Sequence, residues 1–264
     1  MLRALKRPLL IRTRMSTTGS SINKNNNNNR IELTSKEIFS EQPMSILTSK
    51  GYTFVLLNGS TLDGGDALTR DNFNRFWTQS IYRVCVDGGA NLLNDLEKGS
   101  PAHYIPHTII GDMDSALGEV VEEYERCGVE VIRAKNQDST DFSKALELVL
   151  SRVDQGHLDD DKPIVVYGSA QCDRMDHQFA LIQTLLKFNQ KVPIYLVQDL
   201  SLTRVLDKGH HILDFSTGFE GKGGFGLFPV GQAANVITRG LKWDVDGVLE
   251  FGSFVSSVRL IHLN

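Results

Sequence analysis

Short apolar runs alternate with stretches of helical periodicity between residues 51 and 188, and this alternation limits the chain to few fold classes. Most runs have the length and the Gly, Asn or Asp ending of a buried strand. They are GYTFVLLNGS (51–60), IYRVCVDGG (81–89), HTIIGDMDS (107–115), VEVIRAK (129–135) and KPIVVYGS (162–169). Apolar residues recur at helical spacing in residues 139–153 and 174–188. Buried strands that alternate with amphipathic helices predict an α/β domain with a mainly parallel sheet.

The pattern changes after about residue 190. The apolar runs become short and strand-like, Gly, Asp and Lys separate them, and no strong helical period appears. This pattern predicts a smaller antiparallel domain, a β-sandwich or half-barrel. We therefore expect an α/β domain over residues 49–190, followed by a β-sandwich domain over residues 191–264.

The first residues differ in composition from the rest of the chain. Residues 1–30 contain seven Lys and Arg residues and no acidic residue, and they include the asparagine-rich stretch NKNNNNN. A basic, acid-free start is typical of a mitochondrial targeting segment, whereas an asparagine tract favours a disordered tail. We expect residues 1–48 to form such a disordered or targeting tail.

Charge and cysteine usage exclude several classes of protein. The net charge is −4 and the pI is about 6.0, whereas sequence-independent nucleic-acid binding needs clustered cations. No apolar run approaches the roughly 18 residues that span a bilayer. The three cysteines are far apart and form no CxxC pair, which suits a reducing compartment. We predict a cytoplasmic protein that binds neither nucleic acid nor membrane.

Two aspartates directly follow the third apolar run. Asp112 and Asp114 are two residues apart, so on an extended segment both carboxylates project to the same side. Carboxylate oxygens are the ligands that Mg²⁺ prefers, and a cation would remove their mutual repulsion. Taken alone, this pair of residues is explained more simply by a solvated polar turn. Because ligands of parallel sheets gather at the carboxyl ends of the strands, we expect Asp87, Asp112 and the loop 168–177 at that edge.

The segment NQDSTDFSK (136–144) predicts a helix start with two alternative uses. Asp138 or Ser139 can cap the helix, and the helix dipole favours a carboxylate at Asp141 in the first turn. The alternative is a phosphate site formed by free backbone N–H groups, the Thr140 hydroxyl and Lys144. In that second interpretation Asp141 is a third Mg²⁺ ligand.

Two further segments have side chains suited to a nucleotide or an aromatic cation. The segment 168–180 resembles a strand, a turn and a helix start, and Arg174 has a planar guanidinium that binds phosphate bidentately. Trp243, in GLKWDVDG (240–247), lies in an expected hairpin. It is either a partly buried hairpin residue or a flat face for an aromatic, cationic ligand. Together with the acidic segments, these residues indicate Mg²⁺–nucleotide chemistry.

The order of these motifs resembles the thiamine pyrophosphokinase family. The motifs are VDGGAN, IIGDMDS, QDSTDFSKAL, RMDHQFA, GLFPVG and GLKWDV, and the resemblance covers roughly residues 50–257. It implies that residues 49–190 form a nucleotide-binding catalytic domain and that residues 191–264 bind thiamine. It also implies transfer of the pyrophosphoryl group of ATP to thiamine, which yields thiamine diphosphate and AMP, by a homodimer with active sites at the subunit interface.

The resemblance also implies roles for individual residues. Asp112, Asp114 and Asp141 match the Mg²⁺ carboxylates that serve catalysis, and Trp243 matches the face on which thiamine stacks. The positions that match the ATP and phosphate shell are Asp87, Gln137, Thr140, Lys144, Arg174 and Asp176.

The end of the chain departs from the family pattern. Family members usually continue after the final FG with a VSTSN-like segment, whereas here FGSFVSS is followed by VRLIHLN. Our hypothesis is that this end is a read-through or mispredicted gene model. If the end is genuine, the β-sandwich loses a strand and part of its thiamine site. This departure is the basis for an alternative function, a catalytically impaired thiamine-binding relative with a sensor or regulatory role.

Overall fold

The structure is a computed structural model, and it describes part of the chain in two compact units. The described residues are 9–14, 30–33, 38–41, 50–59, 67–97, 104–136, 138–168, 174–189, 191–198, 201–214, 224–254 and 256–260. One unit comprises Lys50–Asp199, and the other combines Met1–Ser49 with Leu200–Asn264. We describe each unit by itself.

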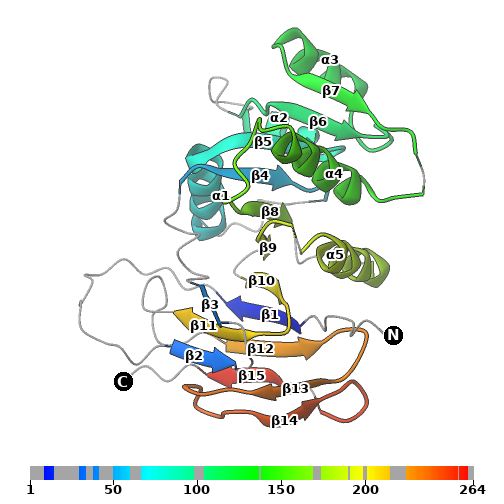
Figure 1. Cartoon of the computed structure of the whole chain (residues 1–264). Coiled ribbons are helices and arrows are strands. Elements are labelled where there is room, and N and C mark those ends of the chain that lie inside the picture. Colours follow the sequence, from blue (N-terminus) through cyan, green and yellow to red (C-terminus); the bar gives the residue numbers. More distant parts are fainter. Residues whose placement is uncertain are drawn as a thin grey trace. The chain divides into compact units, whose positions relative to one another are not determined.

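The first unit is an α/β domain whose six strands run parallel to one another (Figure 1). The strand order is β9-β8-β4-β5-β6-β7, so the order reverses between β4 and β8. The strands are β4 (Tyr52–Leu56), β5 (Ser80–Val86), β6 (Thr108–Gly111), β7 (Glu130–Arg133), β8 (Ile164–Gly168) and β9 (Ile194–Gln198). Every residue of β4, β8 and β9 is buried, as expected for strands covered on both faces.

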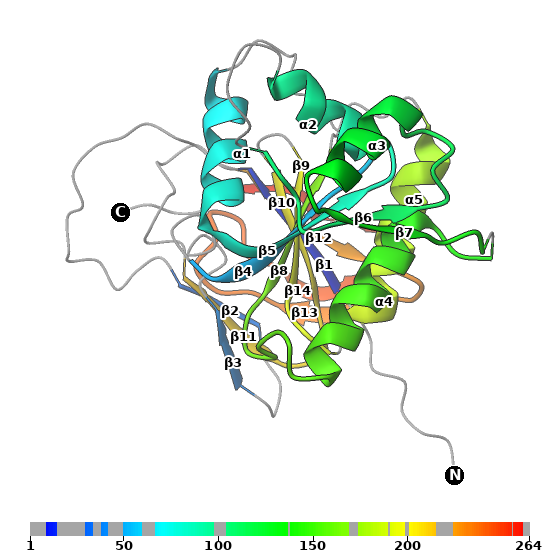
Figure 2. The same ribbon diagram turned by 90° about the horizontal axis from the view of Figure 1, so that it is seen from above.

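Among the described residues, five helices connect these strands. They are α1 (Ala67–Gln79), α2 (Gly89–Glu97), α3 (Gly118–Arg126), α4 (Asp141–Asp154) and α5 (Met175–Phe188). Helix α1 lies on one face of the sheet and α4 and α5 lie on the other (Figure 2). Right-handed crossovers explain this division, because the strand order runs one way up to β7 and the other way after it.

The sheet confirms the predicted α/β class, but the domain extends further along the chain than predicted. All five predicted strands form, and so do the helices predicted at residues 139–153 and 174–188. The predicted boundary at residue 190 precedes β9, yet β9 pairs in parallel with β8. All five residues of β9 are buried, which is typical of a core strand in a parallel sheet. The sequence pattern changes from alternating strands and helices to short strands near residue 190, so β9 was assigned to the second domain.

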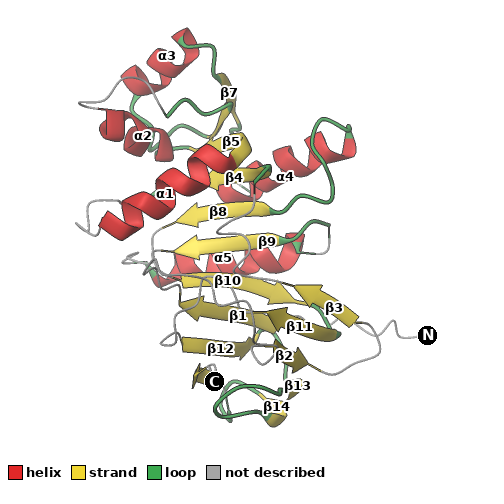
Figure 3. Ribbon diagram, turned by 90° about the vertical axis from the view of Figure 1, so that its left-hand side faces the viewer, coloured by secondary structure: helices red, strands yellow, loops and turns green. Residues whose placement is uncertain are grey.

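The second unit is built mainly from antiparallel strands, which agrees with the predicted β domain. Four of its strands lie in the order β15-β12-β1-β10; in Figure 3 the arrows of β10, β1 and β12 alternate in direction. A separate three-stranded sheet has the order β2-β11-β3, and β13 and β14 form a hairpin. The strands are β1 (Leu9–Arg14), β2 (Arg30–Leu33), β3 (Ile38–Glu41), β10 (Ser201–Leu206), β11 (His210–Asp214), β12 (Gly224–Pro229), β13 (Ala234–Ile237), β14 (Asp246–Leu249) and β15 (Ser256–Leu260).

Three strands lie where the sequence predicted a tail. Strands β1, β2 and β3 fall within residues 1–48, and β1 pairs with both β10 and β12. Their partners lie more than 150 residues further along the chain, so local composition carries no signal of the pairing. Most of residues 1–30, including the asparagine tract, lies outside the described residues.

The C-terminal segment is described as far as residue 260. Val258 and Arg259, which depart from the family pattern, belong to β15, and β15 pairs antiparallel with β12. Among the described residues, no helix has the length and apolar character needed to cross a membrane.

Candidate active site

The register between β5 and β6 places two predicted site segments side by side. Val86 is aligned with Ile110, and the backbone N–H of Asp87 donates to the Ile110 carbonyl at 3.0 Å. Asp87 therefore lies against Gly111, where a methyl group would be only 2.8 Å from the Asp87 Cβ. The glycine of IIGDMDS thus leaves the space that Asp87 occupies.

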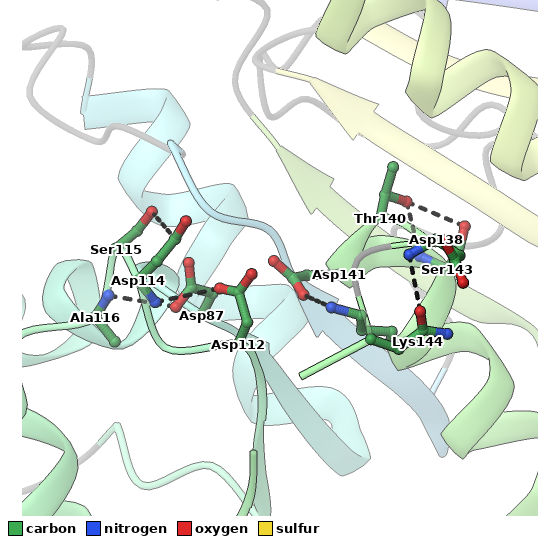
Figure 4. Close-up of polar contacts among 11 residues, drawn as sticks. Asp87, Asp112, Asp114, Ser115, Ala116, Asp138, Thr140, Asp141, Ser143 and Lys144 are labelled. Atoms are coloured by element: carbon green, nitrogen blue, oxygen red, sulfur yellow. Dashed lines mark hydrogen bonds and ion pairs between the residues drawn. The ribbon is translucent and has the colours of Figure 1, made fainter. Parts of the chain in front are cut away.

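Three carboxylates converge at this edge of the sheet. Each of Asp87, Asp112 and Asp114 offers an oxygen, and these oxygens all lie within 4.8 Å of one another (Figure 4). Asp87 is buried, Asp112 is half-buried and Asp114 is exposed. Two unit charges at that separation repel by about 3 kcal/mol at an effective dielectric near 20. A divalent cation bound among the carboxylates would attract each of them and so outweigh their mutual repulsion.

The pKa of Asp87 reflects this crowding. Burial raises the pKa of the Asp87 carboxyl above its usual range, and the charges of Asp114 and Asp141 raise it further. Hydrogen bonds from Ser115 and from the Gly88 backbone oppose the increase in pKa.

The three carboxylate oxygens of the cluster are hard ligands, which suit Mg²⁺ or a similar divalent ion.

The loop that carries Asp112 and Asp114 has an unusual backbone. Met113 has a φ of 67° and Asp87 has a φ of 45°, both in the left-handed region that non-glycine residues rarely adopt. Local hydrogen bonds brace the loop: Asp112 Oδ1 accepts from the Asp114 N–H at 3.2 Å, and Asp87 Oδ1 accepts from the Ala116 N–H at 3.3 Å. Backbone strain of this kind gathers at functional sites.

The start of α4 places a fourth carboxylate near this cluster. Thr140 caps the helix, because its Oγ1 accepts from the Ser143 N–H at 3.2 Å; the predicted caps Asp138 and Ser139 were wrong. Asp141 pairs with the Lys144 ammonium at 2.7 Å, and the Lys144 side chain is only 7% exposed. In Figure 4, Asp141 lies between Asp112 and Lys144.

The structure therefore groups the predicted metal ligands differently. Asp87, predicted for the ATP shell, lies with Asp112 and Asp114, whereas Asp141 is paired with Lys144. The contribution of Asp141 to metal binding stays a prediction.

Two other predicted phosphate ligands already contact each other. The Arg174 guanidinium donates to both carboxylate oxygens of Asp176, at 3.2 and 2.5 Å, and this pair keeps the pKa of Asp176 below its usual range. Both side chains are exposed at the start of α5, so a phosphate that binds Arg174 competes with Asp176. Gln137 lies outside the described residues.

In the second unit, a short loop presents Trp243. The ring is 47% exposed, and the Lys242 ammonium lies 4.7 Å from its centre. Asp244 organises the loop, since its Oδ1 accepts from the Thr238 hydroxyl at 3.0 Å and from the Leu241 N–H at 3.1 Å. The Thr238 hydroxyl in turn accepts from the Val245 N–H at 2.7 Å.

Sequence reasoning missed residues that shape the site without bearing its chemistry. Gly111 makes room for Asp87, Asn91 contacts the loop after Asp114, and Asp244 orders the loop of Trp243. The signals were the glycine between strand and aspartates, the asparagine in VDGGAN and the aspartate after the tryptophan. Each signal acquires meaning only when its distant partner is known.

Comparisons with known proteins match segments of both units. Two family models match the chain: "Thiamin pyrophosphokinase, catalytic domain" over residues 73–196, and "Thiamin pyrophosphokinase, vitamin B1 binding domain" over residues 210–257. The first match contains the carboxylate cluster and the starts of α4 and α5, and the second contains Trp243.

Named relatives and solved structures point the same way. Thiamine pyrophosphokinase 2 of Oryza sativa subsp. japonica is 34% identical over 201 residues, which cover 71% of this chain and 74% of the relative. Thiamine pyrophosphokinase of Saccharomyces cerevisiae is 26% identical over 67% of this chain and 70% of the relative.

The crystal structure of yeast thiamin pyrophosphokinase matches with a TM-score of 0.72 at 22% identity, over 86% of each chain. The thiamin pyrophosphokinase of Candida albicans matches with a TM-score of 0.64 at 21% identity, over 94% of this chain and 92% of that one. These two structures establish the fold. The sequence matches in both segments show that this chain belongs to the thiamin pyrophosphokinase family.

Proposed function

We propose that the protein is an ATP:thiamine diphosphotransferase, which transfers the pyrophosphoryl group of ATP to thiamine and releases AMP. The observation that carries this proposal is the match to both the catalytic and the vitamin B1 binding segments in one chain. The convergence of Asp87, Asp112 and Asp114 within the catalytic segment supports it independently.

Mg²⁺ is the cofactor that these residues fit. Three carboxylate oxygens within 4.8 Å provide the hard ligands that Mg²⁺ prefers, and phosphate oxygens and water would complete its coordination. We propose that Asp87, Asp112 and Asp114 hold the ion, with Asp141 as a further ligand. When bound, Mg²⁺ would neutralise charge on the phosphates.

The remaining predicted residues then hold the triphosphate. Lys144 supplies a buried positive charge at the start of α4, and Arg174 supplies a planar fork at the start of α5. Thr140, Asp176 and Gln137 complete this proposed ATP shell. Such positioning is most of what pyrophosphoryl transfer requires of a protein.

The chemical step is a displacement at phosphorus. The hydroxyl oxygen of thiamine forms a bond to the β-phosphorus of ATP while the bond from that phosphorus to the α,β-bridging oxygen breaks. AMP leaves with the bridging oxygen, and the hydroxyl proton is released. The exposed ring of Trp243 offers a face on which the cationic, aromatic thiamine can stack.

We further propose a cytoplasmic homodimer with active sites at the subunit interface. The family resemblance supports the dimer, and Met175 and Phe179, 68% and 64% exposed one turn apart on α5, offer an apolar face to a second copy. Light scattering of the purified chain measures the dimer. Imaging of a C-terminally tagged chain distinguishes the cytoplasm from the mitochondrial alternative suggested by the basic N-terminus.

The test of the activity is a coupled AMP assay. Purified protein with ATP, Mg²⁺ and thiamine is expected to form AMP and thiamine diphosphate in equal amounts, and to form neither when thiamine is omitted. Folded protein that forms no thiamine diphosphate would overturn the proposal. The carboxylates of the cluster are all present, and the matches to thiamine pyrophosphokinases lend no support to the catalytically impaired alternative.

A further inference from the structure

The Asn91 side chain forms two hydrogen bonds with the loop that follows Asp112 and Asp114. Its side-chain Nδ2 donates to the Ser115 carbonyl at 2.9 Å, and its Oδ1 accepts from the Leu117 N–H at 2.9 Å. The two bonds bracket Ala116, whose own N–H donates to Asp87. Three consecutive residues of the loop are thus held by hydrogen bonds, two of them to Asn91 of α2 and one to Asp87, which precedes that helix.

The turn that leads into α2 carries both Asp87 and Asn91, and so provides both a carboxylate of the cluster and the hydrogen bonds to the loop. Asp87 lies two residues before α2, and its carbonyl accepts from the Ala90 N–H at 3.1 Å. The Asn91 N–H donates to the Gly88 carbonyl at 3.1 Å. Asp87 and Asn91 therefore belong to one rigid turn, so Asn91 fixes the distance between Asp87 and the loop that carries the other two carboxylates.

The loop needs to be held because its backbone is strained. Met113, between Asp112 and Asp114, has a φ of 67°. A left-handed residue other than Gly, Asn or Asp persists where its surroundings compel it. Among the described contacts, the bonds from Asn91 come from a helix outside the loop, so they oppose relaxation of the whole segment.

The chemistry of the two bonds explains why the residue is asparagine. A backbone N–H only donates and a carbonyl only accepts, so the side chain has to accept at one atom and donate at the other. An aspartate in this place keeps the bond from Leu117 but sets a second negative oxygen against the Ser115 carbonyl. An alanine loses both bonds.

We propose that Asn91 is a positioning residue that sets the divalent-cation affinity of the Asp87–Asp112–Asp114 cluster by holding the loop 112–117. This inference rests on the proposed metal site. Partners that orient metal ligands in this way typically change metal affinity by about 10- to 100-fold when they are removed. The loop is partly exposed, so we expect a change near the lower end, about tenfold.

The experiment measures Mn²⁺ binding to the full-length protein by electron paramagnetic resonance, without ATP or thiamine. Asn91→Ala is expected to weaken Mn²⁺ binding about tenfold, and Asn91→Asp is expected to weaken it less or equally. Asn94→Ala is the matched control, because Asn94 lies on the same helix and is likewise half-buried. It should leave Mn²⁺ binding unchanged.

A second substitution separates positioning from general destabilisation. Met113→Gly removes the backbone strain, so the double variant Asn91→Ala/Met113→Gly should recover part of the lost Mn²⁺ affinity. In turnover, Asn91→Ala should raise the Mg²⁺ concentration needed for half-maximal rate while leaving the KM for thiamine unchanged.

Unchanged Mn²⁺ affinity in Asn91→Ala would overturn the inference, as would an equal loss in Asn94→Ala. These outcomes are distinct from failure of the proposed function. In that case the wild-type protein would form no thiamine diphosphate, whatever its affinity for Mn²⁺. If the wild-type protein binds no Mn²⁺ and its turnover does not depend on Mg²⁺, the inference also fails.

Discussion

Gly111 and Asp87 fit against each other with no room for a side chain at the glycine. A methyl group at Gly111 would lie 2.8 Å from the Asp87 Cβ and 3.2 Å from its Cα. We expect Gly111→Ala to displace Asp87, to lower the free energy of unfolding by about 1–3 kcal/mol, and to reduce kcat strongly. Chemical denaturation and the AMP assay measure the two effects.

Gly118→Ala is the control for that substitution. Gly118 begins α3, and a methyl group there meets no atom within 4 Å. Since alanine is a better helix former than glycine, this variant should be as stable as the wild type or slightly more stable. Equal activity in the two variants would contradict the view that Gly111 sets the position of Asp87.

Mg²⁺ should stabilise the wild-type protein through the carboxylate cluster. A ligand that binds only the folded state raises the free energy of unfolding by about 2.7 kcal/mol at 100 times its Kd, so the Tm should rise by several degrees at saturation. We expect Asp112→Asn to lose this increase and to abolish turnover. Its Tm without metal should equal or exceed that of the wild type, because repulsion among the three carboxylates is relieved.

Thermal melts of the wild type and of Asp112→Asn, with and without Mg²⁺, measure these changes in Tm. Asparagine keeps the acceptor oxygen for the Asp114 N–H, so the loop itself should survive the substitution. A large loss of stability without metal would favour a purely structural role for Asp112. An unchanged Mg²⁺ response would place the metal elsewhere.

The sequence predicted the α/β domain well because its signals are local. Apolar runs such as IVVYG in β8 and the helical period of α4 exist within single windows of about 15 residues. The strands of residues 9–14 and 30–41 could not be predicted in this way, since their partners are β10, β11 and β12. The boundary after residue 190 was wrong for a related reason: the domain to which β9 belongs is decided by its pairing with β8.

The residue types of the candidate site and its place at the carboxyl edge of the sheet were predicted, but the set of carboxylates that group together was not. The aspartates of IIGDMDS were recognised from their spacing and their place after a strand. Asp87 was expected at the same edge of the sheet as Asp112, but its grouping with the two aspartates depends on the β5–β6 register, and the pairing of Asp141 with Lys144 depends on a buried ion pair. Neither of these is written in the spacing of residues along the chain.

Lys144 should matter for both stability and turnover. Its side chain is 7% exposed, and its partner Asp141 is 24% exposed. Removal of one partner of a fully buried pair costs about 3–5 kcal/mol, and we expect about 2 kcal/mol for Lys144→Met because Asp141 still reaches water. The double variant Lys144→Met/Asp141→Asn should recover most of the free energy of unfolding but not the kcat. Recovery of neither quantity would contradict the pairing.

Asp244 should affect thiamine and not ATP. Asp244→Ala loses the bonds to Thr238 and Leu241 that shape the loop of Trp243. Each is worth about 1 kcal/mol, so the loss of both should raise the KM for thiamine by up to about 30-fold while the KM for ATP stays constant. Asp244→Asn keeps an acceptor oxygen and should behave close to wild type. Equal increases in both KM values would mean that the loop does not serve thiamine.

His107 should contribute to the pH dependence of stability. Partial burial lowers the pKa of His107, and the charges of Arg83 and Arg152 lower it further. The residue is exposed overall, but its ring packs against Tyr82 and its Nδ1 accepts from the Arg83 N–H at 3.1 Å, which requires the neutral ring.

The sign follows from proton binding. The unfolded chain binds the His107 proton at a higher pH than the folded protein, so its stability contribution is complete above the unfolded pKa of about 6.5. The contribution declines as the pH falls from there to the lowered folded pKa. His107→Asn keeps an acceptor and does not titrate, so Tm should decline less between about pH 8 and pH 5. The exposed His157→Asn is the control; a decline as steep as that of the wild type in His107→Asn would refute the assignment.

The most direct test of the central claim is the rate of AMP formation by the full-length protein with ATP and Mg²⁺, measured with and without thiamine and repeated with Asp112→Asn. We expect AMP and thiamine diphosphate in equal amounts for the wild type, only when thiamine is present, and neither product for the folded variant. Wild-type AMP formation that ignores thiamine, or full turnover by folded Asp112→Asn, would contradict the claim.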